Sequence, residues 1–301
     1  MSRISFEILN HETTMAQDLP GSMMGFPQKG DNWMKVGIIG YGSMGKMLVD
    51  QFASSGKLKN GFLLVSNRTK EKLKTLPAGA NACNNNRELA CLADIVFLCV
   101  KPGDLKEIIE EIRPDLKHES ILVSLNGSVP FALMEKISAG KIAKVIPSLT
   151  AEINRSQTLV CYNQYIEEED KAQLKGLLEC IGDIIELPEN EIGMGAELVS
   201  CMPGFIASIF DVICRCAKKH TEIPASQVIH MVLKTMTATG ELMLKNDSSF
   251  EEIVSRVATK GGITEEGTKV INERFPAVAD QIFEKTLEKR KQTAECAAKC
   301  F

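Results

Sequence analysis

The chain has 301 residues, of which 44% are hydrophobic and 25% charged, and its formal net charge is −4. This length is enough for two domains with buried cores. The acidic balance, without any block of basic residues, disfavours nucleic acid and anionic membrane surfaces as partners. No apolar run approaches the ~20 residues of a membrane span. The ten cysteines include no CxxC pair, so we interpret them as reduced thiols of a cytoplasmic protein and predict no metal site.

The pattern along the chain predicts an α/β domain over residues 34–188. Residues 1–33 have no sustained hydrophobic period and lack the pattern of a secretory signal, so we interpret them as a disordered extension. Short apolar strands then alternate with helices, which is typical of a doubly wound, mostly parallel sheet of Rossmann type. The expected strands lie within 35–40, 61–66, 93–102, 120–127, 143–148, 157–163 and 182–188, and helices are expected at 42–55, 103–112 and 131–137.

Residues 189–301 show no strand pattern, only long helical periodicity, and predict an all-helical domain. The first two helices, 191–220 and 224–245, are apolar over more than one face. This favours burial against a partner and hence a homodimer built through the helical domain. The alternative is that these helices are enclosed in the core of their own subunit. Further helices are expected at 249–258, 264–275 and 277–299.

The stretch "KVGIIGYGSMGKML" contains a glycine turn of the GxGxxG type. Gly40 allows the tight turn, Gly42 lets the backbone approach a pyrophosphate, and Gly45 lets the helix pack closely on the sheet. Ser43 and Met44 lie between them at the start of the helix, whose N-terminus would face the anion. Because the turn follows a strand and opens a helix, it predicts a dinucleotide site.

The end of the second strand indicates which dinucleotide. NAD sites usually carry an acidic residue there, about twenty positions after the turn. This chain has Ser66, Asn67, Arg68 and Thr69 instead, and a guanidinium suits a 2′-phosphate. The sequence therefore favours NADP(H) over NAD(H). A purely structural role is compatible with this interpretation: the stretch is then a polar turn in which Asn67 or Thr69 caps the next helix.

Beyond the glycine turn, "SNRT" at 66–69, "VKP" at 100–102 and "GGIT" at 261–264 occur in order over the chain from Met34 onward. With these motifs the chain resembles the pyrroline-5-carboxylate reductase family. That family combines a Rossmann domain with a helical domain that interlocks in a dimer. "VIPSLT" at 145–150, "VSCMPGF" at 199–205 and "TKGGIT" at 259–264 make it most similar to the divergent late-competence paralogues. The resemblance adds four residues to the cofactor site: Asn86, expected near the nicotinamide end, Val100, Lys101 and Pro102.

The resemblance implies hydride transfer from NADPH to the C=N bond of a cyclic imino acid, with conversion of 1-pyrroline-5-carboxylate to L-proline as the expected reaction. Gly261, Gly262, Ile263 and Thr264 open a helix, and free amides there suit the substrate carboxylate. We expect Thr264 to bond the imine nitrogen with help from Thr259, and Lys260 to add a cation. The alternatives are a plain N-cap at Thr264, with Glu265 and Glu266 satisfying the helix dipole, and a solvated Lys260.

Two other functions remain open at this stage. The altered "VIPSLT" and "VSCMPGF" segments favour a nucleotide-binding regulatory paralogue with little or no turnover. A 2- or 3-hydroxy acid dehydrogenase shares the same domain layout, but that class uses a lysine on the long connecting helix. The segment "EIGMGAELVSCMPGFIAS" contains no lysine, which places this function last. We assign Cys201, in the same segment, to packing.

Overall fold

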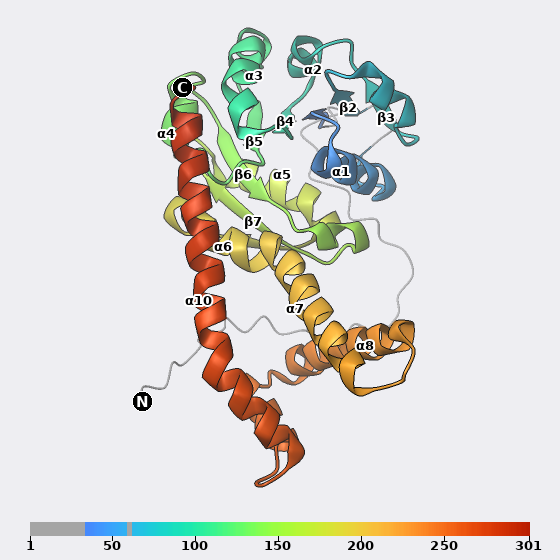
Figure 1. The fold of residues 1–301 in the computed structure, drawn as a ribbon. Helices are drawn as coiled ribbons and strands as arrows, with labels where there is room; N and C mark the ends of the chain where they lie inside the picture. The colour runs from blue at the N-terminus through green and yellow to red at the C-terminus, as the bar shows by residue number, and fades with distance from the viewer. Residues whose placement is uncertain (1–33, 59–61) are drawn as a thin grey trace.

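The computed structural model describes residues 34–58 and 62–301 (Figure 1). The expected disorder of residues 1–33 lies outside this range. The sheet has eight strands in the order β3-β2-β1-β4-β5-β6-β7-β8. Only β6 and β7 pair antiparallel, so the predicted doubly wound, mostly parallel sheet is confirmed. Its strands are β1 Val36–Ile39, β2 Leu63–Ser66, β3 Ala80–Ala82, β4 Ile95–Leu98, β5 Ile121–Ser124, β6 Ile142–Ile146, β7 Ser156–Tyr162 and β8 Gly182–Glu186.

Helices cover both faces of the sheet, which is why its central strands are buried on both sides. Alternate residues of one strand enter different cores: Ile38 packs with α1 and α5, whereas Ile39 packs with α2, α3, α4 and α6. The C-terminal end of the chain joins the second core through Ala297. The covering helices are α1 Ser43–Ser54, α2 Asn86–Leu92, α3 Leu105–Ile112, α4 Phe131–Glu135, α5 Glu168–Leu178 and α6 Ile192–Ala196.

Downstream of β8 the described chain is helical throughout, as predicted. A short π-helix, Glu197–Cys201, joins α6 to α7 Met202–Ala217, and α8 Ala225–Asn246 and α9 Phe250–Val257 follow. Two expected helices, 264–275 and 277–299, are in fact one: α10 runs from Ile263 to Ala298 over 36 residues, with Pro276 inside it. A proline removes a single backbone hydrogen bond, and good helix formers on both sides continue the helix through it.

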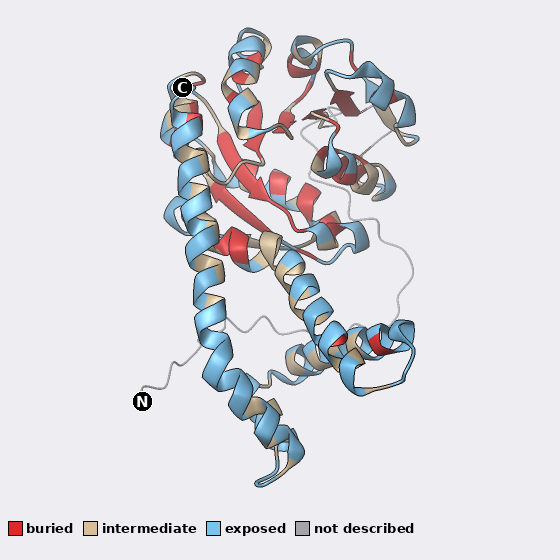
Figure 2. Ribbon diagram, viewed as in Figure 1, coloured by how far each residue is buried: buried red, intermediate tan, exposed pale blue. Residues whose placement is uncertain are grey.

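Most residues of the helical region are exposed or intermediate in a single chain (Figure 2), and large apolar side chains are among them. Leu244 is 87% exposed, Phe250 81% and Ile263 95%. The helix Glu189–His220 contains an 18-residue window with a mean hydropathy of 1.6, and by length and composition it is apolar enough to cross a membrane. This corrects the expectation that no apolar run approaches that length. The helix itself was predicted, as 191–220, but charged residues such as Glu197 interrupt it, so that no uninterrupted apolar run was counted.

Candidate active site

Three glycines shape the turn between β1 and α1. Gly40 has a φ of 100°, and a Cβ at this residue would lie 2.4 Å from the carbonyl oxygen of Cys99. At Gly45 a Cβ would lie 1.9 Å from the carbonyl oxygen of Gly40, so helix and turn pack backbone against backbone. At Gly42, by contrast, a Cβ would meet no atom within 4 Å. The turn is therefore tight on the protein side and open at Gly42, where a ligand can approach.

The N-terminus of α1 faces this open space without a cap. Gly42 is the N-cap, no side chain caps the helix, and its first turn holds no acidic residue. The first backbone bond of the helix runs from Lys46 N to Gly42 O, which leaves the amides of Ser43 and Met44 without an acceptor inside the helix. Uncapped amides and the positive end of the helix dipole suit a phosphate group. These residues fit the pyrophosphate of a dinucleotide.

At the end of β2, Asn67 has a structural role that sequence reasoning missed. Its Oδ1 accepts a hydrogen bond from Tyr41 N at 2.9 Å, and its Nδ2 donates to Thr69 O at 2.9 Å. Asn67 therefore fixes the glycine turn against the loop after β2. Thr69 occupies the N-cap position of a short 3-10 helix, but its side chain makes no capping bond. The capping role suggested for either side chain is thus wrong.

Arg68 is exposed and makes no hydrogen bond or ion pair within the described part of the chain. It is free to contact a ligand beside the turn. The neighbouring Ser66 is buried, and its hydroxyl donates to Asn86 Oδ1 at 2.8 Å. Asn86 in turn donates through Nδ2 to Glu111 at 2.7 Å. Asn86, the first residue of α2, is thus held against the end of β2, on the side of β1 away from β4.

The nicotinamide side of such a site lies over the ends of β4 and β5. Val100, Lys101 and Pro102 follow β4 after one intervening residue, Cys99, and Lys101 is exposed. The side chain of Asn126, just after β5, donates to Val100 O at 3.1 Å. Because parallel strands end at one edge of the sheet, these residues share that edge with the glycine turn. The structure thus brings all the expected cofactor residues to one edge of the sheet.

The loop 259–264, the expected substrate site, has a different cap and fewer free amides than we expected. Gly262, not Thr264, is the N-cap of α10. Gly261 N donates to Glu265 Oε2 at 2.6 Å, and Gly262 N donates to Thr259 O at 2.8 Å. Within the described residues, the amides of Ile263, Thr264 and Glu265 at the start of α10 are left without an acceptor. Of the four amides at 261–264, two therefore remain free for an anion, fewer than the sequence suggested.

This loop is far from the glycine turn of its own chain. Ala297, near the other end of α10, is buried in the core of the sheet region. With a rise of about 1.5 Å per residue, a helix places Thr264 about 50 Å from Ala297. Figure 1 shows the start of α10 at the far end of the helical region from β1 and α1. A single chain therefore does not bring the cofactor residues and the loop 259–264 together.

A buried ion pair lies close to the nicotinamide side. Glu197, 1% exposed, accepts from Arg290 of α10 at 2.7 Å, and Arg290 Nη1 lies 3.5 Å from Ser128 Oγ. Burial first, and then the Glu197 carboxylate, raise the pKa of the Cys201 thiol. Arg290 acts in the opposite direction on this pKa, but burial and Glu197 outweigh it, so Cys201 stays protonated, in line with a packing role. The sequence offered one signal of this ion pair, which is the carboxylate of Glu197 inside an apolar helix. Arg290 stands in the charged run "EKRKQ", where nothing distinguishes it from its neighbours.

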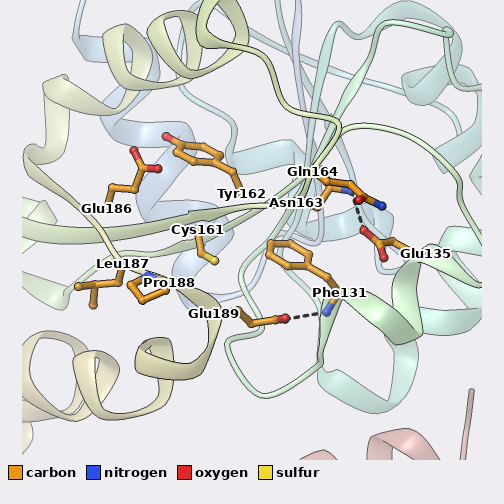
Figure 3. Close-up of a pocket in the computed structure, with 10 residues that line it drawn as sticks. All are labelled: Phe131, Glu135, Cys161, Tyr162, Asn163, Gln164, Glu186, Leu187, Pro188 and Glu189. Carbon is orange, nitrogen blue, oxygen red and sulfur yellow. Dashed lines mark hydrogen bonds between the residues drawn. The ribbon is translucent and has the colours of Figure 1, made fainter.

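A shallow pocket lies at the opposite edge of the sheet (Figure 3). Tyr162 pairs with Ala143 near the start of β6, which places the pocket where the parallel strands begin. Glu189 accepts from Phe131 N at 2.7 Å there and pairs with the buried Lys144 at 2.5 Å. These bonds are internal, and none of the expected site residues lines the pocket. Its lining consists of Phe131, Glu135, Cys161, Tyr162, Asn163, Gln164, Glu186, Leu187, Pro188 and Glu189.

A Rossmann sheet with an open glycine turn and an uncapped helix at its carboxyl edge defines a dinucleotide-binding protein. Residues 35–127 match the family model "NADP oxidoreductase coenzyme F420-dependent", and residues 189–293 match "Pyrroline-5-carboxylate reductase dimerisation". Pyrroline-5-carboxylate reductase 3 of Bacillus subtilis is 31% identical over 88% of this chain and 98% of its own length. The chain belongs to the pyrroline-5-carboxylate reductase family, as predicted, and is an oxidoreductase that uses a nicotinamide cofactor.

The chain is also similar to a second curated protein and to a solved structure. ComE operon protein 4 of Bacillus subtilis is 26% identical over 89% of this chain and 99% of its own length. The structure of Plasmodium falciparum pyrroline carboxylate reductase with NADP bound superposes with a TM-score of 0.79 at 22% identity, covering 87% of this chain and 98% of that chain. The structural likeness confirms the fold.

Proposed function

We propose that the protein is an NADPH-dependent reductase that transfers a hydride to the C=N bond of a cyclic imino acid, converting 1-pyrroline-5-carboxylate to L-proline. The observation that carries this proposal is the open turn at Gly42 below the uncapped N-terminus of α1, in a chain of this family. When bound, the cofactor supplies the hydride. The residues of the chain hold its phosphates, fix the substrate and exclude water from between them.

The preference for NADPH rests on Arg68. Ser66 and Asn67 use their polar atoms inside the protein, so the exposed side chains of Arg68 and Thr69 are left to meet a 2′-phosphate, and Arg68 is the one that carries a positive charge. The turn 66–69 holds no carboxylate that would repel a phosphate or accept from the ribose hydroxyl of NADH. We place the protein in the cytoplasm, where its ten cysteines, all free in the structure, stay reduced.

The substrate loop would come from a second subunit. The separation along α10 prevents Thr264 from reaching the glycine turn of its own chain, so a complete site needs another copy. The exposed apolar residues of α7–α10 offer the surface for a homodimer, since a monomer seldom exposes so many. They include Val212, Ile213, Ile229, Met231, Leu233, Leu242, Leu244, Phe250, Val254, Val257, Val270, Ile271 and Val278. In such a dimer Ile263 and Thr264 offer their amides to the carboxylate, with Lys260 and Thr259 beside them.

One observation favours a second candidate, a nucleotide-binding regulatory protein with little turnover. Glu265 Oε2 accepts a hydrogen bond from Gly261 N at 2.6 Å, and the carboxylate places a negative charge beside the expected site for the substrate carboxylate. Such a charge weakens the binding of an anionic substrate while leaving the dinucleotide site untouched.

NADPH oxidation, followed with pyrroline-5-carboxylate, with NADH in place of NADPH, and without substrate, separates the two candidates. We expect oxidation that depends on the substrate and is faster with NADPH. Binding of NADPH without turnover would refute the reductase proposal and leave the regulatory one.

A further inference from the structure

Asn126 lies in the turn after β5, and hydrogen bonds of its backbone and its side chain hold it in place. The backbone amide donates to Ser124 Oγ at 3.2 Å, and the side-chain Nδ2 donates to Val100 O at 3.1 Å. The next residue is closely packed, since a Cβ at Gly127 would lie 3.3 Å from Ile146 Cδ1 at the end of β6. Asn126 is therefore fixed relative to the loop after β4.

The side-chain oxygen of Asn126 is available to a ligand. Oδ1 accepts no hydrogen bond from the part of the chain that the structure describes. Among the described residues, Glu197 Oε2 is the one side-chain oxygen that is both fully buried and without a partner. Because Asn126 Oδ1 has no partner either, it is not fully buried, and the residue as a whole is half-buried. A fixed amide oxygen that contacts solvent suits an N–H donor of a ligand.

This oxygen lies on the side of the sheet that faces the reacting end of a dinucleotide. The strand order places β2 on one side of β1, and β4 and β5 on the other. Arg68, which we propose to meet the 2′-phosphate of the adenosine half, follows β2. Val100 and Asn126 each stand two residues beyond the end of their strands, β4 and β5. A dinucleotide that crosses the glycine turn from β2 therefore carries its nicotinamide toward Asn126.

We propose that Asn126 Oδ1 accepts a hydrogen bond from the amino group of the nicotinamide carboxamide, and that Asn126 thereby selects cofactors with a primary amide. This inference rests on the proposed function and adds a specificity-determining residue to it. Nδ2 already binds Val100 O, so Oδ1 is the atom of this side chain that is left for the cofactor. A hydrogen bond to the carboxamide restrains rotation of the ring about its glycosidic bond, so that one face of the ring meets the substrate.

The test compares the binding of two cofactors. In the 3-acetylpyridine analogue of NADPH a methyl group replaces the amino group of the carboxamide, so the carbonyl is kept and the donor is lost. The Kd of each cofactor is measured by titration calorimetry for the wild type, for Asn126→Ala and for Asn126→Asp, which keeps an acceptor of the same shape. Gln164→Ala removes an exposed side-chain amide at the opposite edge of the sheet and is the matched control.

We expect the wild type and the Gln164→Ala control to bind NADPH about 3- to 10-fold more tightly than the analogue, which is the effect of one neutral hydrogen bond. Asn126→Ala should raise the Kd of NADPH about 3- to 10-fold and leave that of the analogue within about twofold. The preference of Asn126→Asp should lie closer to that of the wild type than the preference of Asn126→Ala does.

A wild type that binds both cofactors equally would overturn the proposal. So would an equal loss of both in Asn126→Ala, because a purely structural role of the bond to Val100 does not distinguish the two cofactors. The reverse order of the Asp and Ala variants would overturn it as well.

The binding measurement separates this inference from the proposed function, because it does not depend on turnover. If the wild type prefers NADPH over the analogue through Asn126 but does not oxidise NADPH with pyrroline-5-carboxylate, the reductase proposal fails and the Asn126 contact stands. If the wild type turns over the substrate but binds both cofactors equally, the Asn126 contact alone is refuted. Failure to bind either cofactor would refute both.

Discussion

Replacing Gly42 by alanine separates ligand binding from folding in the glycine turn. The added methyl meets no atom within 4 Å, and the backbone at Gly42, with φ −87° and ψ −163°, is extended and open to any residue. Alanine is a weaker N-cap than glycine, so we expect the free energy of unfolding to fall by about 0.5 kcal/mol. In a protein of this size that lowers Tm by about 1–2 °C.

The effect on the cofactor should be much larger. The methyl takes the space through which a pyrophosphate reaches the amides of Ser43 and Met44. A hydrogen bond to a charged group contributes about 1.5–3 kcal/mol, so the loss of one such bond raises the Kd of NADPH about 10- to 100-fold. Titration of NADPH, together with thermal unfolding of the same samples, measures both quantities. A Gly42→Ala protein with wild-type NADPH affinity would refute the turn as a pyrophosphate site.

Gly45→Ala is the matched control, because its methyl would clash inside the protein. The added Cβ would lie 1.9 Å from the carbonyl oxygen of Gly40, a backbone atom that cannot rotate away. Overpacking of this kind costs about 1–3 kcal/mol, which lowers Tm by about 2–10 °C. An unchanged Tm would show that the packing argument is wrong, whatever happens to NADPH.

Three other outcomes are expected. Arg68→Ala should raise the KM of NADPH about 10- to 100-fold and leave that of NADH within about twofold; equal weakening would contradict recognition of the 2′-phosphate. Thr264→Ala should lower kcat with pyrroline-5-carboxylate at least about tenfold while NADPH affinity is retained, and an unchanged rate would remove Thr264 from the site. Ile271→Arg, at a side chain that is 58% exposed, should convert a dimer to monomers in light scattering, because a charge is costly in an apolar interface; a dimer that persists would place the interface elsewhere.

Local signals were sufficient to predict the sheet and the cofactor turn. The central strands are short apolar runs buried on both faces, and the glycines of the turn have the spacing of a known motif. Of their backbone contacts only that of Gly45 with Gly40 is local in sequence, whereas Gly40 meets Cys99 after β4. Strand β3 was missed because "ANA" is three residues long and half exposed at the sheet edge, with neither apolar pattern nor β-branched residues. The single helix α10 was divided at Pro276 because sequence rules treat an internal proline as a break.

Features that depend on residues far apart in the chain could not be predicted. Glu197 and Arg290 are paired by the crossing of two helices, and Asn67 meets Tyr41 only when β1 and β2 lie side by side. We assigned the loop 259–264 to the site from its motif alone. Nothing in the sequence indicated that α10 holds this loop far from the glycine turn of the same chain. Its amide donors were overestimated for a local reason: Glu265 lies one helical turn beyond Gly261 and folds back onto it.

The length of α10 has a consequence for genetics. Because this helix separates the loop 259–264 from the nucleotide site of its own chain, each proposed site in a dimer combines halves from two polypeptides. A Gly42→Ala chain and a Thr264→Ala chain, each impaired alone, would then complement one another when they are co-expressed. Random pairing leaves one intact site in each mixed dimer, or about a quarter of the sites overall. Two defective alleles would thus restore activity to one another, which a site contained within one chain would never allow.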